Sequence, residues 1–267
     1  MSSSSNSKSD LISVVIPLHN EALNVKLMGL ALTKALKDLN YEILFVNDGS
    51  TDDTSIQLKK LNEKSVIVIE LDKNYGQSSA IAAGIDFARG NYIVTMDGDL
   101  QNDPNDIPWM LEILKNKKFD LIAGFRKERK DPFFKKIPSI IANYIIQILT
   151  KTKVKDNGCA LKIFNRSTAK KLIFSGETHR YITTISFLNG LKIMQVPVNH
   201  MPRKFGKSKY GLCRTFKVVY AIYLIILNKY YSNHIFKLKE KNYSIRNIYY
   251  NCNKLTKRNS IQFQTLQ

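Results

Sequence analysis

Two aspartates one residue apart, Asp97 and Asp99, are the residues of this 267-residue chain best suited to chemistry. They directly follow the apolar run at 91–96, which is typical of a buried strand, so they fall in the loop that leaves its carboxyl end. In open α/β sheets, ligands bind at that edge. Because like charges repel, the pair favours a cation between them, and Mg²⁺ or Mn²⁺ would leave positions open for a substrate diphosphate. Taken alone, the pattern also fits a solvated acidic turn.

Polar residues follow two further apolar runs. Asp48 comes directly after the run at 41–47, a position where acidic residues of nucleotide-binding sheets meet base or ribose. Its neighbours at 50–53 fit a helix N-cap cluster instead. Glu21 ends the segment V-I-P-L-H-N-E at 15–21, and either lines the same site or favours a helix start through its charge. This segment lacks the G-x-G-x-x-G pattern, which argues against a nicotinamide or flavin enzyme.

Strand and helix patterns alternate through the first half of the chain. This alternation predicts an α/β fold built of βαβ units with right-handed crossovers, and therefore a mainly parallel central sheet flanked by helices. In such a sheet, the loops that contain Asp48 and Asp97 meet at one edge. The expected strands cover 11–17, 41–47, 65–71, 91–96 and 119–125, and the expected helices cover 21–39, 54–63, 77–88 and 106–115.

The second half has a different pattern. A helix at 137–149 is apolar except for one polar face with Asn143 and Gln147, and lysines flank it, which suits an interfacial helix on anionic lipid. An ordinary core helix is the alternative. A short βα piece follows, then a helix at about 181–189 and strands near 192–201. The expected organisation is a disordered leader at 1–10, one domain at 11–212 with halves at 11–125 and 126–212, an apolar helix at 213–231 and a basic tail at 232–267.

Charge is divided unevenly along the chain. Residues 1–114 carry 9 Lys and Arg against 16 Asp and Glu, a balance of −7, whereas 115–267 carry 32 against 6, a balance of +26. This asymmetry suggests a polyanionic partner: nucleic acid, an anionic membrane or a phosphorylated substrate. The three cysteines are widely spaced and predict neither a zinc site nor a disulfide framework. The apolar run at 216–227 is shorter than the ~20 residues that span a bilayer, so no transmembrane helix is expected.

The motifs V-I-P-x-x-N-E, N-D-G-S-x-D-x-T and D-G-D-L-Q-x-x-P, in this order, resemble those of the family 2 glycosyltransferases with the GT-A fold. The resemblance extends to the polyprenyl-phosphate branch, which is similar to dolichol-phosphate mannose synthases. The segments that carry it are GFRKERKDP, KDNGCALKIF at 155–164, HRYI at 179–182 and RKFGKSKYG at 203–211.

This resemblance implies roles for individual residues. The nucleotide-binding wall would comprise Pro17, His19, Glu21 and Asp48. The metal site, for Mg²⁺ or Mn²⁺, would comprise Asp97, Asp99 and Gln101. Acceptor and donor phosphates would lie near Lys135, Ser139 and Ser208. The catalytic set would be Asp97, Asp99, Arg126, Arg203 and Lys209.

Three positions leave alternatives open. Lysines stand at 135 and 136, where arginine would give bidentate phosphate contacts. His179 lies at an expected helix start and either faces the acceptor or has a structural role. Asp156 precedes an Asn-Gly turn, and the resemblance places its equivalent near the active site.

The expected function is that of an inverting, metal-dependent hexosyltransferase. The resemblance implies transfer from a nucleoside-diphospho-sugar, of the GDP-mannose or UDP-glucose type, to a polyprenyl phosphate at the cytoplasmic membrane face. The protein would be cytoplasmic and peripherally attached to an anionic membrane surface. Related members carry C-terminal membrane helices, which are not expected here. The chain is therefore either a soluble type or a shortened form that needs a partner for anchoring, and a membrane-anchoring partner or a homo-oligomer is considered.

Two alternatives differ in the acceptor or in the class of protein. One is a family 2 glycosyltransferase that acts on a saccharide or protein. The other is a non-enzymatic basic nucleic-acid-binding protein. No recognised reader motif occurs in the basic half, and the acidic half would repel phosphates, so a nucleic-acid partner is not expected.

Overall fold

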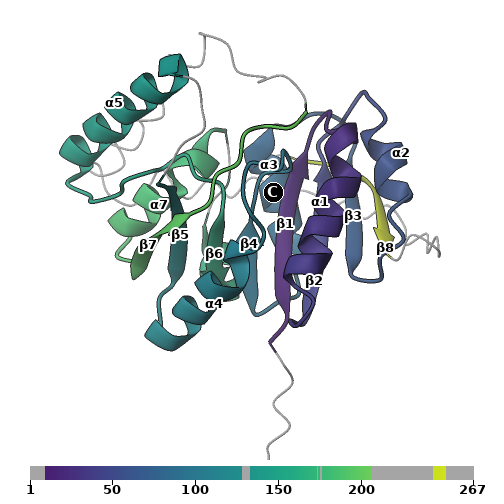
Figure 1. Cartoon of the computed structure of the whole chain (residues 1–267), viewed down its shortest axis with the longest axis horizontal. Coiled ribbons are helices and arrows are strands. Elements are labelled where there is room, and N and C mark those ends of the chain that lie inside the picture. Colours follow the sequence, from purple (N-terminus) through teal and green to yellow (C-terminus); the bar gives the residue numbers. More distant parts are fainter. Residues whose placement is uncertain (1–9, 128–132, 173, 175, 206–242, 251–267) are drawn as a thin grey trace, which may run out of the picture.

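The computed structural model describes residues 10–127, 133–172, 174, 176–205 and 243–250 (Figure 1). Within these residues, eight strands form one sheet in the order β7-β5-β6-β4-β1-β2-β3-β8. Neighbouring strands are parallel except where β6 pairs with β4 and β5, and where β8 pairs with β3. The strands are β1 (Ile12–Leu18), β2 (Tyr41–Asn47), β3 (Val66–Leu71), β4 (Tyr92–Thr95), β5 (Leu121–Arg126), β6 (Lys162–Asn165), β7 (Ile193–Val198) and β8 (Ile245–Tyr250).

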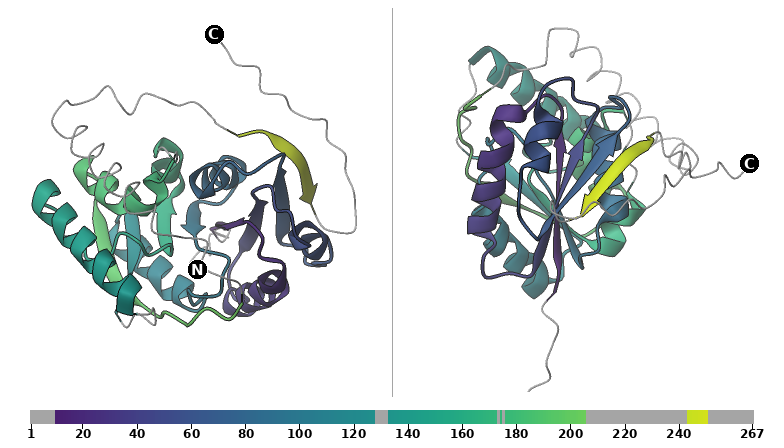
Figure 2. Two further views of the ribbon diagram at one scale, coloured as in Figure 1. Left: turned by 90° about the horizontal axis from the view of Figure 1, so that it is seen from above. Right: turned by 90° about the vertical axis from the view of Figure 1, so that its right-hand side faces the viewer.

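Helices cover both faces of the sheet (Figure 2). Because side chains alternate along a strand, Val14 and Ile16 pack with α1, α2 and α4, while Val15 packs with α3, α6 and α7. Gly84 in α3 permits close approach, since a Cβ there would lie 2.3 Å from Val15 Cγ1. The helices are α1 (Ala22–Ala35), α2 (Thr54–Lys59), α3 (Gln77–Phe87), α4 (Asp106–Lys117), α5 (Phe133–Thr150), α6 (Arg166–Lys171) and α7 (Thr178–Leu188).

Helix α5 lies outside both layers, beside the β7 end of the sheet (Figures 1 and 2). Its polar residues Asn143 and Gln147 bond to the segment after the helix, and so face inward. Among the side chains of α5 that the structure describes, the exposed ones are Ile140, Ile141, Tyr144, Ile145, Ile148 and Leu149. The helix therefore presents its apolar face outward. In the part of the chain described here, no helix has the length and apolar character needed to cross a membrane.

The α/β class, the parallel pairing of the first four strands and the order of helices in the first half are confirmed. The segment at 232–267, expected only as a basic tail, includes a strand, because Ile245–Tyr250 form β8 against the open edge of β3. Near 192–201 there is one strand rather than several. The expectations for residues 1–9 and for a helix at 213–231 lie outside the described residues.

Candidate active site

The Asp97–Asp99 loop leaves β4 at the carboxyl edge of the sheet. Gln77, the first residue of α3, donates from Nε2 to Asp97 Oδ1 at 2.6 Å. The backbone N–H of Gln101 donates to Asp99 Oδ1 at 3.1 Å. Gly98 packs so closely on the end of β1 that a Cβ would lie 2.2 Å from Leu18 Cδ2. Strand β1 and helix α3 thus fix the position of the loop.

Arg203 reaches this loop from a distant part of the chain. Its Nη2 donates to Asp99 Oδ2 at 2.5 Å, and its Nη1 lies 3.9 Å from Glu21 Oε1. Glu21 is itself oriented by Asn24, whose Nδ2 donates to Glu21 Oε2 at 2.6 Å. The guanidinium therefore lies between a carboxylate of the β4 loop and one of the β1 loop, and three of the predicted site residues meet.

The segment that carries Arg203 is paired with the β4 loop through its backbone. The N–H of Met201 donates to the carbonyl of Gln101 at 2.8 Å, and His200 forms an isolated β-bridge with Asn102. The side-chain amide of Gln101 donates from Nε2 to the carbonyl oxygen of Met201 at 3.5 Å. The amide of Gln101 thus faces this segment, and its role as a metal ligand stays a prediction.

The carboxylate pair is suited to hold a cation. Burial, and after it the charge of Asp97, raises the pKa of Asp99 from 3.8 to about 6, although Arg203 and the N–H of Gln101 lower it. Among the residues that the structure describes, no group of three or more His, Cys, Asp and Glu is placed to hold a metal ion. Two carboxylates fit a Mg²⁺ or Mn²⁺ ion whose other ligands are diphosphate oxygens and water.

The predicted nucleotide-binding residues lie at the same edge, between β1 and β2. Pro17 pairs with Val46 in the sheet, and His19 Nδ1 lies 2.8 Å from the carbonyl oxygen of Asp48. The Asp48 carboxylate accepts the N–H groups of Tyr75 at 2.7 Å and Gly76 at 2.9 Å. Burial raises the pKa of Asp48 against these bonds. Asp48 therefore orders the turn before α3, and its contact with a nucleoside stays a prediction.

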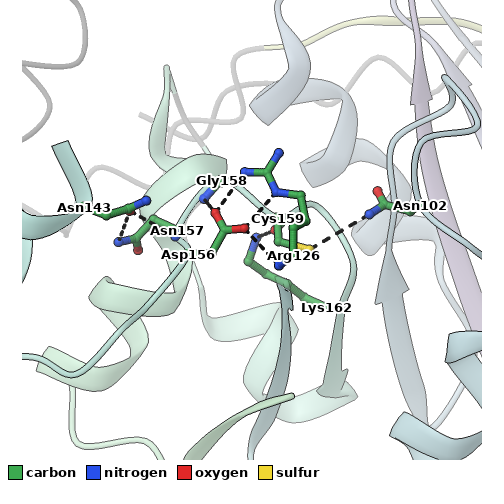
Figure 3. Close-up of polar contacts among 8 residues, drawn as sticks. All are labelled: Asn102, Arg126, Asn143, Asp156, Asn157, Gly158, Cys159 and Lys162. Carbon is green, nitrogen blue, oxygen red and sulfur yellow. Dashed lines mark hydrogen bonds and ion pairs between the residues drawn. The ribbon is translucent and has the colours of Figure 1, made fainter. Parts of the chain in front are cut away.

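Arg126 ends β5 at the same edge and is held by Asp156 (Figure 3). Its Nε donates to Asp156 Oδ2 at 2.8 Å and its Nη2 to Oδ1 at 2.9 Å. The backbone N–H of Arg126 adds a bond to Oδ2 at 3.2 Å. This bidentate pair fixes the plane of the guanidinium. The pairing of Arg126 with Asp156 was not predicted from the sequence.

Other polar residues near this edge were missed by the sequence analysis. Gln77 begins α3 beside Asp97, and the hydroxyl of Ser78 lies 2.7 Å from His179 Nδ1 in α7. The place of Gln77 could have been predicted from the expected start of the helix at 77, because a helix that follows a parallel strand begins at the carboxyl edge of the sheet. Lys162 in β6 is buried, which lowers its pKa, and its Nζ donates to the carbonyl of Cys159.

The remaining predicted residues are not tested by these contacts. Lys135 and Ser139 lie in α5. Ser208 and Lys209 lie outside the described residues. Their roles stay predictions.

The candidate site thus lies at the carboxyl edge of the mainly parallel sheet of an α/β fold. Residues 13–173 match the model of Glycosyl transferase family 2, and the chain belongs to that family. Dodecaprenyl-phosphate galacturonate synthase of Rhizobium johnstonii is 42% identical over 216 residues, which are 78% of this chain and 64% of that protein. Undecaprenyl-phosphate 4-deoxy-4-formamido-L-arabinose transferase of Sodalis glossinidius is 34% identical over 220 residues, 80% of this chain and 67% of that protein. The matches thus span about two thirds of the relatives' length.

Solved structures share the fold at low identity. Glucosyl-3-phosphoglycerate synthase from Mycobacterium tuberculosis, in complex with Mn²⁺ and UDP-glucose, has a TM-score of 0.65 and 17% identity, covering 85% of this chain and 81% of its own. Mannosyl-3-phosphoglycerate synthase from Rubrobacter xylanophilus has a TM-score of 0.66 and 14% identity, covering 86% and 78%. At these identities the likeness shows the fold alone, and the expected GT-A fold is confirmed.

Proposed function

We propose that this chain is a metal-dependent hexosyltransferase that moves a sugar, with inversion, from a nucleoside-diphospho-sugar to a polyprenyl phosphate. The observation that carries the proposal is the carboxylate pair of Asp97 and Asp99 at the carboxyl edge of the sheet, with Arg203 on Asp99. Membership of the family supports glycosyl transfer. Two relatives named as polyprenyl-phosphate sugar-transfer enzymes support the acceptor class.

On the donor side, Asp97 and Asp99 would hold Mg²⁺ or Mn²⁺, which would supply positive charge to the departing diphosphate. Arg203 adds N–H donors suited to phosphate oxygens at the same edge. Gln77 keeps Asp97 in place through its side-chain amide. The β1 loop with His19 would line the nucleoside. These residues stabilise charge on the leaving group and position it, which is the main electrostatic requirement of the reaction.

On the acceptor side, the nucleophile needs no proton removed. A phosphate monoester is already ionised near neutral pH, because its second pKa is about 6. The site must therefore bring two anionic phosphates together and offset their repulsion. Arg126 and Arg203 both end at this edge, and Asp156 orients the first of them. Positive charge and orientation thus replace a general base.

The exposed face of α5 would lie on the membrane that contains the acceptor. Ile141 and Ile148 are 53% and 57% exposed, one on each of two helical turns of that face. Lys151, Lys153 and Lys155 follow the helix and are exposed. Apolar burial together with lysine contacts would give peripheral attachment to anionic lipid on the cytoplasmic face.

A transfer assay tests the proposal. Purified protein is incubated with a panel of labelled UDP- and GDP-sugars, a short-chain polyprenyl phosphate, and Mg²⁺, Mn²⁺ or chelator. We expect one donor to give a lipid-linked sugar, with activity lost in chelator and in Asp97→Asn. Asp103→Asn is the matched control in the same loop, because an asparagine can still accept the bond from Asn105.

Two outcomes would contradict the proposal. Full transfer in chelator would remove the metal from the mechanism. Transfer to a saccharide or protein, without any to the lipid phosphate, would support the alternative acceptor class within the same family.

A further inference from the structure

Helix α5 is attached to the domain by polar bonds on its inner side. Gln147 Nε2 donates to the carbonyl of Val154 at 2.7 Å. Asn143 Oδ1 accepts two bonds from Asn157, from the backbone N–H at 3.2 Å and from Nδ2 at 3.3 Å (Figure 3). Both partners lie in the segment directly after the helix. The position of α5 is therefore coupled to that segment.

Asn157 is a buried junction between two helices. The residue is only 2% exposed. Its Oδ1 accepts a hydrogen bond from the hydroxyl of Thr184 in α7 at 2.7 Å. A buried amide that is bonded on both sides cannot turn without leaving polar atoms unsatisfied. A shift of Asn143 must therefore carry Asn157 with it or break these bonds.

The residues on either side of Asn157 lead into the candidate active site (Figure 3). Asp156 holds Arg126, and its Oδ1 also accepts the N–H of Gly158 at 3.0 Å. A Cβ on Gly158 would lie 3.0 Å from Arg126 Nη2, so the turn lies tightly against the guanidinium. Cys159 Sγ accepts from Asn102, which follows the Asp97–Asp99 loop, at 4.0 Å. One turn at 156–159 thus contacts both Arg126 and the loop after β4.

We propose that Asn143 is a positioning residue that couples the seating of α5 on lipid, through Asn157, to the Arg126–Asp156 pair. This inference rests on the membrane contact of the proposed function. With its outer face in water, α5 gains little from staying in one place, because its apolar side chains are exposed. Lipid would fix the helix, and the bonds between Asn143 and Asn157 would then fix the turn that orients Arg126. The enzyme would be fully ordered only where its acceptor is found.

Amide hydrogen exchange measures this coupling without any sugar donor. The N–H groups of Arg126 and Gly158 report on the pair because both donate to Asp156 and neither bonds to Asn143. Vesicles of phosphatidylglycerol and phosphatidylcholine are expected to slow exchange in α5 and at these two amides. A slowing of roughly tenfold at Arg126 and Gly158 would mean that the local opening that exposes these amides has become less favourable by about the contribution of one hydrogen bond.

Two substitutions of one residue separate coupling from a merely structural role. Asn143→Ala removes the acceptor, and we expect vesicles to slow exchange in α5 but no longer at Arg126 and Gly158. Asn143→Asp keeps an oxygen for both bonds from Asn157, and we expect it to retain the full effect. A structural role would instead change exchange equally with and without vesicles.

The inference is overturned if the vesicle effect at Arg126 and Gly158 persists in Asn143→Ala, or if α5 is protected in the wild type while these amides are not. If vesicles leave α5 itself unprotected, the membrane contact fails and the inference falls with it. Transfer to lipid phosphate is measured separately, so failure of the catalytic proposal is recognised independently.

Discussion

An ionised carboxylate at Asp99 destabilises the metal-free protein. Its pKa is raised from 3.8 to about 6, first by burial and then by Asp97. A carboxyl whose pKa is raised on folding contributes stability while it is protonated, and this contribution is lost as the pH rises through the folded value. The free energy of unfolding should therefore fall between pH 3.8 and about 6. This rise in the pKa of Asp99 corresponds to a loss of about 3 kcal/mol in the free energy of unfolding.

Asp99→Asn is expected to remove this pH-dependent loss. Denaturant unfolding at neutral pH without metal should show the variant to be more stable than the wild type, by up to about 3 kcal/mol. Below pH 3.8 the two should become similar. Added Mn²⁺ should stabilise the wild type and not the variant. A variant that is less stable than the wild type at neutral pH would show that Asp99 stabilises the metal-free fold.

Arg203→Ala is expected to lower kcat/KM by ~10²–10³, because in the proposed mechanism it would remove a charge that stabilises the departing diphosphate. Because its guanidinium is paired with the buried Asp99, the melting temperature should also fall, and the rates are compared well below it. Arg203→Lys should recover only part of the rate, since an ammonium group cannot make the paired N–H contacts of a guanidinium. Lys204→Ala is the matched control, because this neighbouring basic residue is exposed. An equal loss of rate in the control would point to general surface charge instead.

At the scale of elements, β8 covers the open edge of β3 and satisfies a buried acid. Glu70 is 6% exposed and accepts from Ser55, and the hydroxyl of Tyr249 donates to Glu70 Oε2 at 3.2 Å. Lys59 Nζ lies 5.2 Å from the centre of the Tyr249 ring. Strand β8 therefore contributes a specific bond as well as backbone pairing.

Tyr249→Phe should lower the free energy of unfolding by about 1–2 kcal/mol, since it removes a hydrogen bond to a buried carboxylate and keeps the ring. Chemical denaturation measures this difference. Tyr250→Phe is the control, because Tyr250 is 39% exposed at the end of the strand. An unchanged stability of Tyr249→Phe would mean that β8 is held by its backbone alone.

The sequence predicted the first half of the fold because its signals are local. Apolar runs and helical periodicity gave the elements from β1 to β5, and the rule for parallel strands placed Asp48 and Asp97 at one edge. Strand β8 was missed for two reasons. Its own sequence gives no periodic signal, and its order depends on pairing with β3, which is far away in the chain. For α5, the pattern gave an amphipathic helix, but the inward direction of Asn143 depends on its bonds to Asn157.

The candidate site was predictable to a similar extent. Asp97, Asp99 and Glu21 follow strands, so the topology alone brings them to one edge. The place of Arg203 was indicated only by the resemblance of its motif, and its contact with Asp99 needed the structure. The partner of Arg126 could not be predicted, because Asp156 lies 30 residues away and pairs through a turn.

At the scale of the whole molecule, charge and apolar surface gather in the second half of the chain. The balance is −7 for residues 1–114 and +26 for 115–267. Helix α5 belongs to the basic half and lies beyond the β7 end of the sheet, away from α1 and α2 (Figures 1 and 2). The donor half would thus face the nucleotide while the basic half faces anionic lipid, which would orient the molecule on a membrane.

Replacement of Ile141 and Ile148 by glutamate should abolish most of this membrane binding. Full burial of an isoleucine side chain is worth about 1.5–3 kcal/mol, and each of these is about half exposed, so loss of both should lower partitioning onto anionic vesicles by at least ~10-fold. Both side chains are more than half exposed, and the melting temperature should stay the same. Liposome flotation measures the binding.

Leu23→Glu on α1 is the control in that assay, since Leu23 is 69% exposed and α1 lies away from α5 in Figure 1. Wild-type binding should also weaken with salt, because each basic residue near an anionic surface contributes ~1 kcal/mol that ions screen. Equal binding to neutral and anionic vesicles would contradict the role of the lysines. Binding that survives in the Ile141 and Ile148 variant but falls in Leu23→Glu would place the contact on α1, and α5 would then be left to contact another protein chain.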